Sequence, residues 1–189
     1  MIRAFALAAA VAFASCATVD TSASRQAAMS AAEGLTPQDV TTGFTIAVVE
    51  GCAAAAEQGK TLEQLGSTKI VRETTPDPMR RPKPGSTLWA PIPGQGIVSI
   101  EQEQGGPCDV SAYGPRVEPT FNAVVAALQA KGYQSQPVPS LGVRSYSHDL
   151  KLTANGRTVR VLLIGDEPGA PGKLSRFSVL SAYVTTTTP

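Results

Sequence analysis

The sequence predicts an α+β fold, with a mostly antiparallel β-sheet, two amphipathic helices packed on one of its faces, and one disulfide. Two segments have the apolar spacing of amphipathic helices, and segments with alternating apolar residues follow each of them. The order helix, strands, helix, strands is typical of α+β domains with an antiparallel sheet. Two cysteines that lie far apart in the chain are available for the disulfide.

The length and composition indicate one domain without a strong overall charge. The chain has 189 residues, of which 42% are hydrophobic and 16% are charged, so it contains enough apolar material for one core. Its 16 Lys and Arg residues and 15 Asp and Glu residues give a formal net charge of +1. A nearly neutral chain has no global field that attracts nucleic acid. We therefore expect no nucleic-acid partner, and the sequence contains no cofactor motif.

Residues 1–16 have the features of a bacterial export signal. Arg3 supplies a positive charge, and an uncharged apolar run extends from Ala4 to Ala14. This run is too short to span a bilayer, which needs about 20 residues. We expect residues 17–35, which are small and polar, to form a flexible tether. Residues 36–189 are then expected to form a single α+β domain.

Two processing routes are compatible with this leader. Signal peptidase recognises two small residues separated by one position, as in Ala12-Phe13-Ala14 and in Ser15-Cys16-Ala17. Alternatively, Phe13-Ala14-Ser15-Cys16 resembles a bacterial lipobox, in which Cys16 carries the lipid, although that pattern prefers Leu at the position of Phe13. The sequence therefore predicts an exported protein, either in the periplasm or anchored to a membrane through a lipid at Cys16.

The first helix is predicted to begin after Thr36 and to end at Gly59. Thr36 is a favourable N-cap, Pro37 suits the first helical position, and Asp39 places an acid in the first turn. Gly59 is a suitable C-cap. The apolar face of this helix is formed by residues spaced four apart, namely Val40, Phe44, Val48 and Cys52.

A second amphipathic helix is predicted from Pro119 to Lys131, where Gly132 ends it. Before it, the expected strands are Thr68 to Thr74, a short one around Ser86 to Ala90 within the proline-rich loop 76–93, Ile97 to Gln104, and Cys108 to Tyr113. The last two are expected to pair antiparallel. After it, we expect strands at Tyr133 to Val138 and at Ser175 to Val184, on either side of a hairpin.

That hairpin is the clearest local prediction. Asn155-Gly156 is a strong two-residue turn signal, and apolar residues alternate on both sides of it. A two-residue turn pairs Leu152 with Val159, Leu150 with Val161, and His148 with Leu163. The same register places Lys151 opposite Arg160, a repulsive pair that Asp149, in the diagonal position, can offset.

Cys52 and Cys108 are the strongest candidate pair in the sequence. The alternatives are a structural disulfide that joins the first helix to the sheet and a redox or metal-binding pair. No Cys-x-x-Cys spacing or ligand cluster accompanies them, which favours the disulfide. Closing a loop of 56 residues is expected to stabilise the fold by roughly 3–4 kcal/mol.

His148 is the only histidine and the one candidate general base. Asp149 is badly placed to orient its ring, because adjacent residues of a strand point to opposite faces of the sheet. A packed or hydrogen-bonded structural histidine is the favoured interpretation. With one histidine, the chain cannot form a histidine-rich zinc site.

The proline-rich loop supplies a candidate partner surface, formed by Arg80, Arg81, Lys83 and Trp89. Such a surface would suit an anionic partner, such as a lipid headgroup, an envelope glycan or an acidic protein. The alternative is a solvated loop whose tryptophan packs on the edge of the domain.

These observations favour a non-enzymatic lipoprotein of the cell envelope that acts as an interaction or structural module. One alternative is an exported hydrolase that uses His148 or carboxylates that the sequence does not pair, which requires a concave pocket holding His148 with a nucleophile or a second acid. Another is a periplasmic module that binds a small ligand, which requires an apolar cavity between sheet and helices.

Overall fold

The computed structural model describes residues 34–73, 83–104, 106–114, 116–138, 145–154, 156–168 and 178–187. The predicted leader, most of the predicted tether, Cys16, Arg80 and Arg81 lie outside these ranges. Three consecutive segments form one long helix: α2 (Pro37–Thr45), the π-helical η1 (Ile46–Ala53) and α3 (Ala54–Gln58). A short helix, α4 (Leu62–Leu65), follows it, and α5 spans Val117–Ala130.

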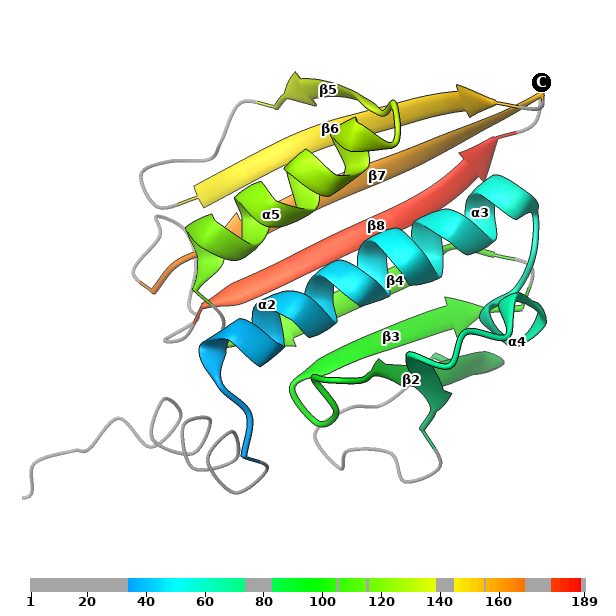
Figure 1. The fold of residues 1–189 in the computed structure, drawn as a ribbon. Coiled ribbons are helices and arrows are strands. Elements are labelled where there is room, and N and C mark those ends of the chain that lie inside the picture. The colour runs from blue at the N-terminus through cyan, green and yellow to red at the C-terminus, as the bar shows by residue number, and fades with distance from the viewer. Residues whose placement is uncertain are drawn as a thin grey trace, which may run out of the picture.

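Eight strands form one antiparallel sheet (Figure 1). They are β1 (Ile70–Arg72), β2 (Ser86–Pro91), β3 (Val98–Glu103), β4 (Cys108–Tyr113), β5 (Gln134–Pro137), β6 (Ser145–Ala154), β7 (Arg157–Asp166) and β8 (Val179–Thr187). Their order in the sheet is β1-β2-β3-β4-β8-β7-β6-β5. The predicted α+β fold is therefore confirmed.

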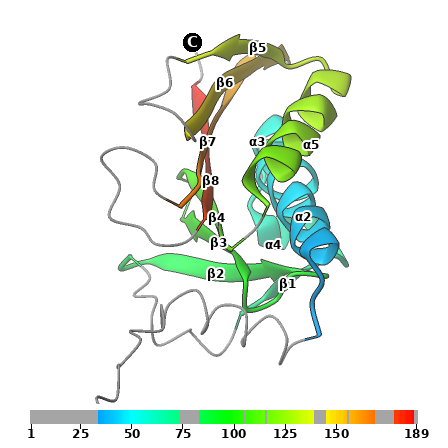
Figure 2. The ribbon, with the colours of Figure 1, turned by 90° about the vertical axis from the view of Figure 1, so that its left-hand side faces the viewer.

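The chain builds this sheet in two halves, each made of a helix followed by strands that pair in sequence. The first half contributes β1 to β4 and the second contributes β5 to β8. The halves meet at the centre of the sheet, where β4 pairs with β8, the last strand. The long helix and α5 contact each other and lie against the same face of the sheet (Figure 2).

The ends of the long helix agree with the sequence prediction, whereas its middle does not. Thr36 and Asp39 form a reciprocal capping box, with Asp39 N donating to Thr36 Oγ1 at 3.1 Å and Thr36 N donating to Asp39 Oδ2 at 2.8 Å. Gly59 ends the helix in the left-handed region, at φ 64°. Between these ends, η1 is wider than an α-helix, which the spacing of its apolar residues did not indicate.

The core lies between the sheet and the helices. Its largest fully buried side chains come from both layers, and include Phe44, Leu128, Leu150, Leu163 and Leu180. Gly43 lets the long helix approach the loop before β3, because a Cβ at this position would collide with the carbonyl oxygen of Pro93.

The β6–β7 hairpin has the predicted register. Leu152 pairs with Val159, Leu150 with Val161, and His148 with Leu163. Gly156 adopts φ 72°, as a turn of this kind requires. Local turn chemistry and alternation were therefore sufficient to place this part of the sheet.

Other boundaries differ from the prediction. The strand expected from Thr68 to Thr74 is limited to Ile70–Arg72, and the last strand, expected from Ser175 to Val184, spans Val179–Thr187. Helix α4 was not predicted, because four residues are too few for an apolar period. The local signals available were its capping box, formed by Thr61 and Gln64, and its left-handed C-cap, Gly66.

Candidate functional site

The predicted disulfide is present and joins the long helix to the centre of the sheet. Cys52 in η1 is bonded to Cys108 at the start of β4, with their Cα atoms 5.8 Å apart. Both residues are buried, at 1% and 4% exposure. The bond therefore acts as a covalent link between the two layers of the fold.

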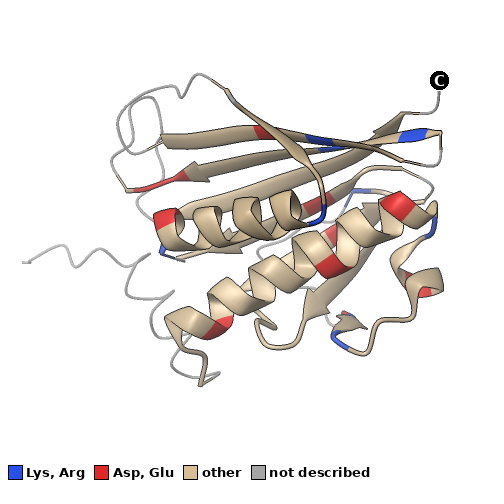
Figure 3. Ribbon diagram, turned by 45° about the horizontal axis from the view of Figure 1, so that its top comes forward, with Lys and Arg blue, Asp and Glu red and all other residues tan. Residues whose placement is uncertain are grey.

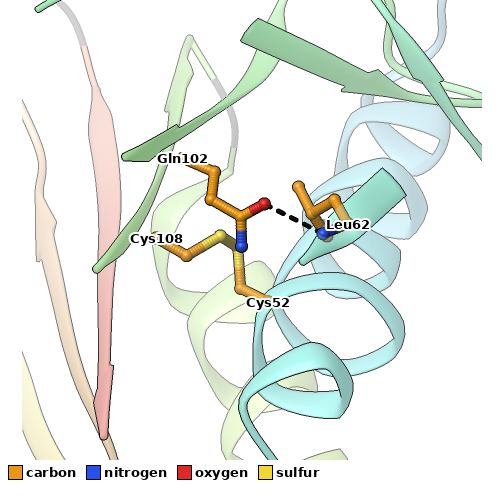
Figure 4. Close-up of a disulfide and its surroundings, with 4 residues drawn as sticks. All are labelled: Cys52, Leu62, Gln102 and Cys108. Atoms are coloured by element: carbon orange, nitrogen blue, oxygen red, sulfur yellow. Dashed lines mark hydrogen bonds between the residues drawn. A yellow bond between two sulfur atoms is a disulfide. The ribbon is translucent and has the colours of Figure 1, made fainter. Parts of the chain in front are cut away.

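A hydrogen bond beside the disulfide joins α4 to the sheet. The backbone N of Leu62 donates to Oε1 of Gln102 in β3 at 2.9 Å (Figure 4). Gln102 is the β3 residue paired with Cys108. The disulfide and this hydrogen bond together fix the segment after the long helix against the end of the sheet.

A pocket of about 420 Å³ lies at this end of the fold, with the disulfide in its wall. Its lining comes from the helical segment and from neighbouring strands: Cys52, Ala56, Gly59, Lys60, Thr61, Gln64, Gln102, Gly106, Cys108, Arg157, Val184 and Thr186. Strand register explains this convergence. Gln102 of β3 pairs with Cys108 of β4, and Cys108 pairs with Val184 of β8. Two residues further along β8, Thr186 pairs with Val159 of β7. Arg157 lies two residues before Val159 and so shares its face of the sheet.

Two cationic residues line the pocket, and no carboxylate of the described residues does. Lys60 follows the C-cap of the long helix, and Arg157 begins β7. The Arg157 guanidinium lies against Gly59, where a Cβ would collide with its nitrogens. In the described ranges, the long helix and α5 carry acidic but no basic positions, whereas the strands carry both (Figure 3).

His148 makes structural contacts on the helix-covered face of the sheet. Its Nδ1 lies 2.6 Å from the Oγ of Ser135 in β5, and its ring packs edge-on against Phe121 of α5 at 5.4 Å between centroids. Asp149 points to the other face, where it binds Arg160 and Lys151. No carboxylate of the described residues is hydrogen-bonded to the imidazole, so a Ser-His-Asp arrangement is not assembled here.

The other face of the sheet carries a pair of neighbouring carboxylates. Glu101 and Asp109 are cross-strand partners and line a hollow of about 260 Å³ together with Ser111, Tyr113, Ser181 and Tyr183. Both carboxylates bind their neighbours: Glu101 Oε1 accepts hydrogen bonds from Lys83 N at 2.6 Å and Ser86 Oγ at 2.7 Å, and Asp109 accepts one from Lys83 Nζ at 3.2 Å. These hydrogen bonds attach Lys83 and Ser86, at the start of β2, to the neighbouring strands.

The candidate partner surface is not assembled from the residues that the structure describes. Trp89 is only 8% exposed and belongs to the core, whereas the alternative interpretation of the loop placed it on the edge of the domain. Lys83 is exposed and pairs with Glu103 at 2.8 Å and with Asp109 at 3.2 Å. Hydrogen bonds to these carboxylates, first to Glu103, raise the pKa of the Lys83 ammonium above its usual value.

Sequence reasoning missed the pocket and the Ser135–His148 contact. Ser135 lies on an edge strand whose register no turn signal fixes, and the pocket residues are far apart in the chain.

Among the described residues, no helix combines the length and apolarity needed to cross a membrane. The same ranges contain no cluster of three or more His, Cys, Asp or Glu that could hold a metal ion.

Comparison with protein-family models, with curated proteins and with solved structures found no match.

Proposed function

We propose that this protein is an exported protein of the cell envelope, attached to a membrane through a lipid at Cys16, and that its domain is a non-enzymatic interaction or structural module. The proposal combines the leader of residues 1–16, the lipobox-like segment before Cys16, and the disulfide between Cys52 and Cys108. Its partner would be another envelope component, namely a protein, a glycan or a lipid headgroup.

The disulfide is the observation that carries the proposal. Structural disulfides persist in oxidising compartments and are rare in the reducing cytosol. Cys52 and Cys108 account for two of the three cysteines, which leaves Cys16 as the odd one. Lipidation of Cys16, or its removal with the leader, would leave no free thiol in the mature protein.

The contacts of the candidate catalytic residues favour a module over a hydrolase. His148 is held by Ser135 and Phe121, and Asp149 binds cations on the opposite face. Glu101 and Asp109 bind Lys83, so both carboxylates already have partners and are poor candidates for general acid–base catalysis. Neither the pocket beside the disulfide nor the hollow at Glu101 contains His148.

The test is to express the full chain in a bacterium and to measure the mass of its mature N-terminus. A diacylglyceryl mass on Cys16, with membrane association that Cys16→Ala abolishes, is the expected result. A soluble chain that begins at Ser15 or Thr18 would show cleavage without lipidation and would remove the anchor from the proposal. A cytoplasmic chain with an intact leader and two free thiols would overturn it entirely.

A second candidate function, binding of a small ligand, is favoured by one observation. The pocket beside the disulfide has the size of small-molecule sites, which are typically about 300–1,000 Å³. It differs from the apolar cavity expected for such a module, because polar and cationic groups line it.

A further inference from the structure

We propose that the pocket beside the disulfide binds the phosphate group of a small organic anion, held by Lys60 and Arg157. The first argument is charge. Lys60 and Arg157 approach the pocket from different parts of the chain, and no described carboxylate lines it. Neither side chain has an ion pair or side-chain hydrogen bond within the described residues, whereas Lys69, Lys83 and Lys131 each bind a carboxylate.

The second argument is the direction of the hydrogen-bonding groups. Two glutamines line the pocket, and the Oε1 of each already accepts a backbone N–H: Gln102 from Leu62 at 2.9 Å, and Gln64 from Thr61 at 2.9 Å. Their remaining polar ends are NH₂ groups, which only donate. The pocket therefore combines two cations, two amide donors and the hydroxyls of Thr61 and Thr186, so an acceptor-rich ligand suits it.

These donors fit a phosphate better than a carboxylate. A phosphate monoester carries about −1.5 to −2 charges at neutral pH and has three strong acceptor oxygens, which matches two cationic side chains in the lining of one pocket. A carboxylate carries one charge on two oxygens. The guanidinium of Arg157 also suits planar, two-point contact with phosphate oxygens.

The backbone elements around the pocket are already joined without a ligand. The Arg157 guanidinium rests on Gly59, which has no side chain in its way. The disulfide and the Leu62–Gln102 hydrogen bond hold the long helix, α4 and the sheet together around the pocket. Such preorganisation lowers the entropic cost of binding, because these elements need not be ordered by the ligand.

The size of the pocket indicates that the phosphate is attached to an organic group. A volume of about 420 Å³ leaves room beyond the anion, and Ala56, Val184 and the disulfide supply apolar wall there. A soluble phosphomonoester and the headgroup of phosphatidic acid, which is also a phosphomonoester, present the same chemistry to Lys60 and Arg157. The experiment separates these two sources.

The test uses the full chain with Cys16→Ser, which prevents lipidation, and with its disulfide intact. Backbone amide NMR shifts are followed during titration with inorganic phosphate and with glycerol phosphate, each against sodium chloride at equal ionic strength. We expect saturable shifts at Lys60, Thr61 and Arg157, with glycerol phosphate binding more tightly. Arg157→Gln and Lys60→Gln should each weaken binding about tenfold, which corresponds to roughly 1.4 kcal/mol.

Lys69→Gln is the matched control, because it removes one exposed positive charge that pairs with Glu50 outside the pocket. This variant should bind phosphate as the parent chain does. Flotation with vesicles that contain phosphatidic acid, compared with phosphatidylcholine vesicles, identifies the source. Binding to the former that requires Arg157 indicates a lipid headgroup, and binding of glycerol phosphate without vesicle binding indicates a soluble ligand.

Two results would overturn the proposal. One is that phosphate and glycerol phosphate cause no shifts beyond those caused by sodium chloride. The other is that the chain with both Arg157→Gln and Lys60→Gln binds phosphate as tightly as the parent does. Both results are independent of export and lipidation, so they would leave the proposed cellular location unaffected.

Discussion

Asp149 of β6 accepts a hydrogen bond from Nε of Arg160 on the neighbouring strand, at 2.8 Å. Its second oxygen lies 3.1 Å from Nζ of Lys151, the residue directly opposite Arg160 in the hairpin. One carboxylate thus separates two cations that would otherwise face each other across a strand pair. The register of the hairpin places Lys151 opposite Arg160 on the face of the sheet that the helices do not cover, and Asp149 offsets the repulsion between them.

Replacing Asp149 with Asn should destabilise the fold by roughly 1 kcal/mol, because it leaves the cations of Lys151 and Arg160 facing each other. The measurement is urea unfolding at neutral pH, with Lys69→Gln as a control that breaks a pair of opposite charges elsewhere. Equal stability of the parent chain and Asp149→Asn would show that solvent alone screens the repulsion between Lys151 and Arg160.

The pH dependence of this effect has a definite sign. The hydrogen bond from Arg160 holds the pKa of Asp149 below its usual value. A lowered pKa in the folded state adds stability above the pKa of the unfolded chain, about 3.9, and this stability is lost as the pH falls through the folded value. The difference in unfolding free energy between the parent chain and Asp149→Asn should therefore shrink in acid. A constant difference down to strongly acidic pH would contradict the assignment.

Reduction of the disulfide should lower the free energy of unfolding by roughly 3–4 kcal/mol, because it frees a loop of 56 residues in the unfolded chain. The measurement is thermal or urea unfolding with and without reductant, and Cys52→Ala with Cys108→Ala should reproduce the effect. Cys16→Ser is the control, since Cys16 is outside the bond. Identical melting curves with and without reductant would argue against this role.

Replacing Gly43 with Ala should destabilise the protein by roughly 1–3 kcal/mol, the usual range for overpacking. The added Cβ would collide with the backbone carbonyl oxygen of Pro93, so either the long helix or the loop before β3 must shift. Thr42→Ala, at the preceding position of the helix, adds no atom and serves as the control. An unchanged urea midpoint for Gly43→Ala would show that the loop before β3 can shift with little loss of stability.

Ser135 and His148 should be coupled by about 1 kcal/mol, the net value of a typical hydrogen bond. Unfolding of Ser135→Ala, His148→Phe and the double variant gives this energy as a double-mutant cycle. Phenylalanine keeps a ring to pack against Phe121 while removing the ring nitrogen that contacts Ser135. Additive effects of the two changes would mean that the contact contributes nothing to stability.

Three features encoded within a few consecutive residues were predicted correctly. The N-cap at Thr36, the C-cap at Gly59 and the β6–β7 register each depend on neighbours in the chain, so local patterns were sufficient. The disulfide was predictable by elimination, because two cysteines remain once Cys16 is assigned to the leader. The π-helical turn of η1 was missed, because the same apolar spacing also fits an α-helix.

The amino-acid sequence by itself determined the fold class, the ends of the long helix, the hairpin and the cysteine pair, because these follow from the chemistry of single residues and short spacings. Tertiary structure alone decided that β8 pairs with β4, that Ser135 meets His148, and that Lys60 and Arg157 line one pocket. Side chains contributed by distant segments converge only when strand order and helix packing are set. Those depend on burying one shared core, a property that no single segment of the chain contains.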